Sequence, residues 1–244
     1  MSVASANVGG DLRVGNILSR AFEVCGANFV LFGAVMLVVS LPNLIFTLQT
    51  PVFEAPWATG IYFVLGIVLG LFLNTIGEAV ILFGAFQYLS GQPVVPAQAL
   101  QRSLARFLPI LGFAILYVVA LFFGFILLVI PGIILFIMWT VALPACVVEG
   151  LGPVACMRRS TELTRGYRWK IFWIFILLTI ISAIVGGIVE TIAGQGGVVA
   201  KALISLLWSA VWSTYWNCVL VMIYHDLRVV KEGVDTAQIA SIFD

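Results

Sequence analysis

Six long apolar runs divide this chain, and they constrain its fold more than any other feature. The runs cover about residues 28–48, 60–88, 108–129, 132–149, 171–193 and 202–224. A run of about 20 apolar residues is long enough to cross the hydrocarbon core of a bilayer as a helix. Only 9% of the 244 residues are charged, against about 25% in soluble domains. We therefore predict an all-α polytopic membrane protein with six transmembrane helices, forming one domain over residues 1–244.

The positive charges predict how the chain is threaded. Eleven of the twelve Lys and Arg residues lie in alternate gaps between the runs or at the chain ends, and Lys201 is the exception. Short connections that are rich in Lys and Arg stay on the cytoplasmic side, so we expect both termini in the cytoplasm. No cleaved signal peptide is expected. Residues 1–10 are predicted to be flexible, and 225–244 are predicted to form a cytoplasmic tail.

The cytoplasmic connections show a helical period of their own. The first places Val14, Ile17 and Ala21 on one face, and further amphipathic segments precede the third and fifth runs. Such helices suit the membrane interface, and the pattern suggests a threefold repeat of one interfacial helix and two spans. The cations of the later connections and the tail are expected to face anionic lipid or a protein partner. They are Arg102, Arg106, Arg158, Arg159, Arg165, Arg168, Lys170, Arg228 and Lys231.

The second run, residues 60–88, has glycines on one helical face and one acidic residue, Glu78, well inside it. Its glycines indicate close packing of another helix, with a lipid groove or substrate path as the alternative. They are Gly66, Gly70, Gly77 and Gly84. Glu78 follows Asn74 by one helical turn, and a carboxylate in a membrane usually faces the bundle interior or a wet cavity. Glu78, Asn74 and Asn217 are therefore candidates for binding a ligand or a proton, with a packed, hydrogen-bonded acid as the alternative.

Catalytic and metal chemistry finds little support in the sequence. His225 lies beside Asp226, but neighbouring residues point to different sides of a helix, and no nucleophile accompanies them. The four cysteines form no CxxC pair and are expected to be reduced packing residues. They are Cys25, Cys146, Cys156 and Cys218. No metal, cofactor or nucleic-acid partner is expected, and the chain is predicted not to be an enzyme. Pro144 is expected to kink the fourth run.

The end of the chain carries a family resemblance. Residues 224–235 read YHDLRVVKEGVD, which resembles the closing YYDLRxRKEGxD motif of the glycerophosphoryl diester phosphodiesterase membrane-domain family. Supporting segments in the middle of the chain are Ile130-Pro131-Gly132, Ala142-Leu143-Pro144, Glu149-Gly150 and Arg159-Ser160 with Leu163 to Gly166. His225 and Val230 depart from the family pattern. The resemblance covers about residues 10–236. It implies a bacterial multi-span domain of the inner membrane without the family's separate catalytic barrel, and it supplies no catalytic residue.

Three functions follow from these features. The leading one is a non-catalytic integral membrane protein that engages membrane lipids or another membrane protein, self-association included. The first alternative is a transporter or channel with a polar path at Asn74 and Glu78. The second alternative is an intramembrane enzyme, against which the sequence shows no second catalytic group beside Glu78.

Overall fold

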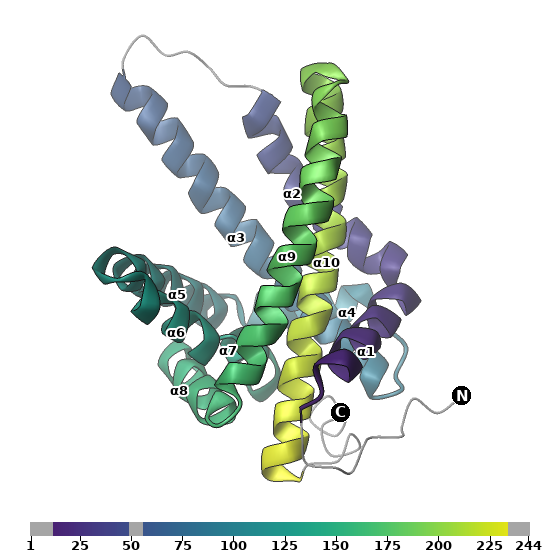
Figure 1. The fold of residues 1–244 in the computed structure, drawn as a ribbon, viewed down its shortest axis with the longest axis vertical. Coiled ribbons are helices and arrows are strands. Elements are labelled where there is room, and N and C mark those ends of the chain that lie inside the picture. Colours follow the sequence, from purple (N-terminus) through teal and green to yellow (C-terminus); the bar gives the residue numbers. More distant parts are fainter. Residues whose placement is uncertain (1–11, 49–55, 234–244) are drawn as a thin grey trace.

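The computed structural model describes residues 12–48 and 56–233, and in these ranges every regular element is an α-helix (Figure 1). The predicted flexible segment 1–10 and residues 234–244 of the predicted tail lie outside the described residues. The helices are α1 (Val14–Ala27), α2 (Phe29–Leu48), α3 (Pro56–Leu89), α4 (Pro96–Ala105), α5 (Phe107–Leu127), α6 (Val129–Met138), α7 (Ala142–Glu149), α8 (Pro153–Thr164), α9 (Arg168–Gly194) and α10 (Gly197–Glu232).

The multi-pass helical architecture that the apolar runs predict is confirmed. In the described ranges, five helices are long and apolar enough to cross a membrane, with α6 and α7 counted as one. The pair α1–α2, which is bent by 83°, adds a sixth when the two helices are taken together as one broken span. The α9–α10 hairpin is the longest feature of the molecule, and the α5–α6 hairpin ends well below the level of its turn (Figure 1).

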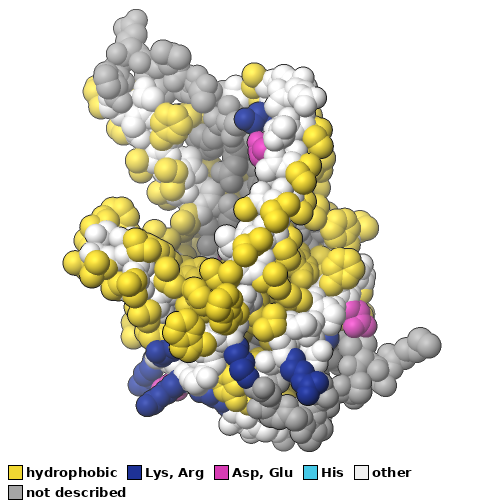
Figure 2. Space-filling model, viewed as in Figure 1, with side chains coloured by type: hydrophobic (Ala, Val, Ile, Leu, Met, Phe, Trp, Pro, Cys, Tyr) yellow, Lys and Arg dark blue, Asp and Glu magenta, His cyan; other side chains and the backbone are white. Residues whose placement is uncertain are grey.

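Three of the short helices, α1, α4 and α8, lie toward one end of the molecule (Figure 1). Figure 2 shows most of the visible Lys and Arg side chains at this same end, below a broad apolar surface, and we call it the basic end. Each short helix precedes two longer segments in the chain, which is the element order of the predicted repeat. The apolar face of α1 packs against α10, because Ile17 and Ala21 are fully buried, and only part of it, such as Phe22, stays exposed.

The fourth run is broken between α6 and α7, as the position of Pro144 predicts. Pro144 lies in the first turn of α7, and a proline ring clashes with the carbonyl four residues earlier while lacking an N–H donor. The break leaves the carbonyl of Met138 free to accept hydrogen bonds from α8. Ser160 Oγ donates to it at 2.8 Å and Thr164 Oγ1 at 3.3 Å, so the short helix α8 stabilises the broken span.

Two of the four glycines of the predicted face of α3, Gly77 and Gly84, pack against α2. A Cβ on Gly77 would lie 3.1 Å from Val39, and a Cβ on Gly84 would lie 2.8 Å from the ring of Phe32. These contacts lie toward the basic end, whereas α2 and α3 diverge toward the opposite end (Figure 1). The glycines therefore allow close helix packing, which is the first of the two interpretations offered by the sequence.

The sixth helix is longer than its apolar run. We predicted a tail from residue 225, but α10 continues to Glu232 and ends at Gly233, whose φ is +62°. His225, Leu227 and Arg228 are buried, so residues 225–232 of the predicted tail form a packed, helical end of α10. With 36 residues, α10 is about 54 Å long, well beyond the roughly 30 Å core of a bilayer.

Candidate functional site

Five polar residues from three helices meet at the basic end and form an ion-pair network. Its members are Glu149, Arg159, Tyr224, Arg228 and Glu232. Glu149 is the last residue of α7, Arg159 belongs to α8, and the other three lie on successive turns of α10. Residues at positions i, i+4 and i+8 share one face of a helix, and this face of α10 is turned toward α7 and α8.

Arg159 is the central cation of the network. Its Nε donates to both carboxylate oxygens of Glu149, at 2.9 and 2.8 Å, and its Nη2 donates to Glu232. The Arg159 side chain is 24% exposed and the Glu149 side chain 16%. Burial alone would lower the pKa of Arg159, but the hydrogen bonds and charges of Glu149 and Glu232 outweigh it and raise this pKa above its usual value. The arginine is therefore fixed in its charged form.

The two carboxylates of the network are held from a second side by α10. The hydroxyl of Tyr224 donates to Glu149 Oε1 at 2.7 Å, and Arg228 Nε donates to Glu232 Oε2 at 2.9 Å. The guanidinium of Arg228 also lies 5.9 Å from the ring centre of Tyr224. Each acid thus receives hydrogen bonds from two residues, and the arrangement clamps α7 and α8 onto α10.

Gly150 connects this network to the start of α5. Its φ is +69°, a left-handed conformation that ends α7 directly after Glu149. A Cβ at this position would lie 1.9 Å from Nη1 of Arg106. The guanidinium of Arg106 therefore rests on the backbone of the loop between α7 and α8, where only glycine leaves room for it.

A smaller polar group lies next to the network on α10. Arg20 of α1 pairs with Asp226 at 2.8 Å, and His225 Nδ1 is 3.2 Å from the same carboxylate oxygen. His225 Nε2 and Arg228 Nη1 are buried, with no hydrogen-bond partner among the described residues. His225 and Asp226 approach each other, although neighbouring helix residues were expected to point to different sides, and the Arg20–Asp226 pair holds α1 against α10.

The predicted cationic surface separates into two groups. Arg159 and Arg228 do not belong to it, because the carboxylates of the network neutralise them. Arg158, by contrast, is 82% exposed and lies 3.7 Å from a Glu162 that is itself 60% exposed. Arg165 and Lys231 are also exposed, and Lys231 donates to the backbone carbonyl of Glu162.

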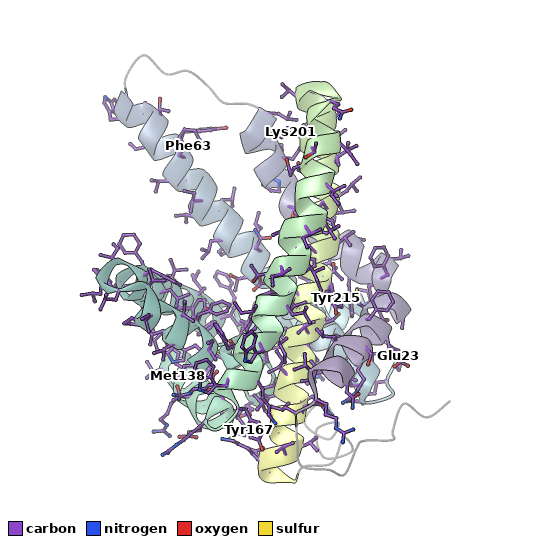
Figure 3. All side chains as sticks on the ribbon, viewed as in Figure 1. Glu23, Phe63, Met138, Tyr167, Lys201 and Tyr215 are labelled. Atoms are coloured by element: carbon purple, nitrogen blue, oxygen red, sulfur yellow. A yellow bond between two sulfur atoms is a disulfide. The ribbon has the colours of Figure 1, made fainter. Side chains whose placement is uncertain are left out.

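Three of the cations lie near one another, and we call Arg165, Arg168 and Lys231 the cation cluster. Lys231 is within electrostatic reach of both arginines. Of the remaining predicted cations, Arg102 lies 5.7 Å from the ring centre of Phe83, and Lys170 lies 5.8 Å from that of Tyr167. Tyr167 is at the basic end, at the start of α9, and Lys201 is at the opposite end (Figure 3).

The predicted polar site on α3 is only partly assembled. Glu78 is half-buried, and no described residue forms a hydrogen bond or ion pair with it. Tyr117 of α5 is within electrostatic reach of its carboxylate. Asn74 donates to the carbonyl of Gly70 at 2.7 Å, and Asn217 donates to that of Ser213 at 2.8 Å. The structure therefore does not join the two asparagines to Glu78, although Oδ1 of Asn217 is buried with no partner among the described residues.

Two of the four cysteines differ from their predicted state. Cys146 of α7 and Cys156 of α8 form a disulfide across a Cα separation of 5.2 Å, whereas Cys25 and Cys218 are free and buried. The short loop after Gly150 brings α7 and α8 together, which a spacing of ten residues does not reveal. Among the described residues, no group of three or more His, Cys, Asp or Glu side chains is placed to hold a metal ion.

Sequence reasoning did not single out Glu149, Tyr224 and Glu232 as site residues. All three, however, fall within the segments that carry the family resemblance, as do Arg159 and Arg228. The structure brings these separate segments together in one network. The motif segments that carry the family resemblance were the sequence signal that could have identified this network.

No family model, curated protein or solved structure matches this chain. The family resemblance therefore remains a prediction from the motifs.

Proposed function

We propose that this chain is a non-catalytic protein of the bacterial inner membrane whose basic end faces the cytoplasm and binds anionic phospholipid. The observation that carries the proposal is the set of exposed cations at that end, Arg158, Arg165 and Lys231, beside a broad apolar surface (Figure 2). Lipid headgroups meet acyl chains at such a boundary, and the cytoplasmic leaflet is negatively charged.

The level of the membrane surface is marked by tryptophans at the start of α9. Trp169 is 76% exposed and Trp173 is 60% exposed, and indole rings favour the interface between headgroups and hydrocarbon. Arg158 and Arg165 precede this level in the chain. A basic group near an anionic surface contributes about 1 kcal/mol, so three such groups supply about 3 kcal/mol, or a preference of roughly a hundredfold.

Native mass spectrometry of the purified protein tests the proposal. The protein is titrated with phosphatidylglycerol or with phosphatidylcholine, and the bound lipids are counted. A variant with Arg158→Gln, Arg165→Gln and Lys231→Gln is expected to retain fewer phosphatidylglycerol molecules and an unchanged number of phosphatidylcholine molecules. Lys201→Gln, at the opposite end, is the matched control and should behave as wild type. Equal phosphatidylglycerol retention in the triple variant would contradict the proposal.

A transporter or channel is the second candidate, and the isolated carboxylate of Glu78 favours it. A half-buried acid with no described partner is satisfied if water reaches it. In a cysteine-free background, Glu78→Cys and Asn74→Cys should then react with a membrane-impermeant maleimide. Ala79→Cys, at a fully buried position of the same helix, should not react. Absence of labelling at both positions 74 and 78 would remove the transporter candidate.

A further inference from the structure

A half-open apolar groove lies between α6 and the first turns of α9. Its volume is about 450 Å³, and its walls are Ile130, Ile133, Ile134, Ile137 and Phe172. Phe136 and Phe175 hold the two helices together nearby, with ring centres 5.2 Å apart. Sites for small molecules have volumes of about 300–1,000 Å³ and mostly apolar walls. The groove therefore has the size and the lining of a site for a hydrocarbon chain.

Arg168 and Trp169 complete the lining of this groove. The Nε of Arg168 is buried with no hydrogen-bond partner, and no described carboxylate lies within ion-pair distance of its guanidinium. Its charged neighbours in the cation cluster, Arg165 and Lys231, are also positive. A buried donor that lacks a partner is costly, and more so when it is charged. The described residues thus leave a guanidinium at the groove without a carboxylate partner.

We propose that the groove holds one acyl chain of an anionic phospholipid whose phosphate pairs with Arg168. The fork of a guanidinium matches two phosphate oxygens, and the apolar walls match the chain attached to the same headgroup. Trp169, which is 76% exposed, lies beside Arg168 at the level where headgroup and chain meet. This site deepens the proposed function by adding one defined lipid to the general attraction at the basic end, and it rests on that function for its orientation.

Charge decides between a lipid and a second copy of this chain as the occupant. A second copy placed against the groove in a symmetric pair would bring its own cation cluster toward the first. Like charges that meet in an interface oppose association. An anionic phospholipid supplies both the missing negative charge and the apolar chain, so it fits the groove better than a second copy.

The test compares variants inside and outside the groove by native mass spectrometry with phosphatidylglycerol under increasing collision energy. Wild type is expected to keep one lipid after all others have been stripped. Arg168→Gln should weaken binding of that lipid about ten- to a hundredfold. Ile134→Trp, at a position 47% exposed, should displace the lipid by filling the groove.

Two controls match these variants. Arg165→Gln removes a charge of the cluster that does not line the groove, and Ile181→Trp adds an indole at a position of α9 that is 40% exposed. Both should keep the last lipid, and gel filtration verifies that every variant is folded. If no single lipid resists stripping in wild type, or if both groove variants keep it, the proposal is wrong.

The two proposals, one for the groove and one for the exposed cations of the basic end, can be tested separately. If the groove variants lose the last lipid while the triple variant of Arg158, Arg165 and Lys231 retains as many lipids as wild type, the groove proposal stands and the surface proposal fails. If the triple variant loses lipids and the groove variants keep the last one, the surface proposal stands and the groove proposal is overturned.

Discussion

Replacing Arg159 by glutamine should destabilise the fold far more than any other single loss of charge on α8. Arg159→Gln leaves Glu149 with Tyr224 as its hydrogen-bond donor and Glu232 with Arg228. Because the side chains of Glu149 and Glu232 are only 16% and 23% exposed, both acids then lie partly buried with excess negative charge. Breaking a fully buried pair costs 3–5 kcal/mol, and partial exposure reduces this to about 3 kcal/mol.

Arg158→Gln is the matched control, since it makes the same substitution one residue earlier on the same helix. Arg158 is 82% exposed, and its pair with Glu162 is 3.7 Å long, so its loss should cost at most about 0.5 kcal/mol. Reversible unfolding in mixed micelles with increasing SDS, followed by tryptophan fluorescence, gives both free energies of unfolding. A difference of about 2.5 kcal/mol between the variants corresponds to nearly a hundredfold in the unfolding equilibrium. Equal destabilisation of the two variants would refute the assignment of Arg159 as the central cation.

Substitutions at Gly150 and Gly84 test whether these positions require glycine. The free energy of unfolding of each variant is measured in the same micelles. Gly150→Ala should cost about 2–3 kcal/mol, because it adds the left-handed strain of about 1–2 kcal/mol and its Cβ would lie 1.9 Å from Arg106. Gly152→Ala has open space and a φ of −74°, so it should change stability by less than about 1 kcal/mol. Gly84→Ala should cost about 1–3 kcal/mol by pushing against Phe32, whereas Gly60→Ala on the same helix meets nothing and should be neutral or stabilising. A Gly84→Ala protein as stable as wild type would show that α2 and α3 do not depend on close approach there.

The helices were predictable because each depends on a local pattern. Apolar runs of about 20 residues can only be helices inside a bilayer, and the break near Pro144 follows from the chemistry of one residue. The amphipathic connections appear as α1, α4 and α8 for the same reason. These features need no knowledge of what lies next to them in space.

The ion-pair network was not predictable in this way. Arg158 and Arg159 are neighbours of the same type, yet one is 82% exposed and the other is the centre of the network. The partners of Arg159 lie 10 and 73 residues away in the chain. Only the packing of α7, α8 and α10 determines which arginine is buried, so sequence spacing assigned both to the surface.

The division between buried and exposed charges changes what the net charge means. The chain carries a formal net charge of only +1, which by itself indicates no preference for anionic partners. At the basic end, however, Glu149, Glu232 and Asp226 are occupied by Arg159, Arg228 and Arg20. At the opposite end, Glu190 lies 3.9 Å from Lys201.

Glu149, Glu232 and Asp226 therefore pair with arginines that hold helices together, and Glu190 pairs with Lys201 at the opposite end. The outward-facing positive charge at this end lies on Arg158 and on the cation cluster, of which Arg168 lines the groove. A neutral protein surface can attract an anionic membrane only if its charges are separated in this manner, because the field of a paired charge is cancelled at the distance of a headgroup. The ion-pair network thus serves the proposed function indirectly: it pairs Glu149 and Glu232 with Arg159 and Arg228, and it leaves the cation cluster available to lipid.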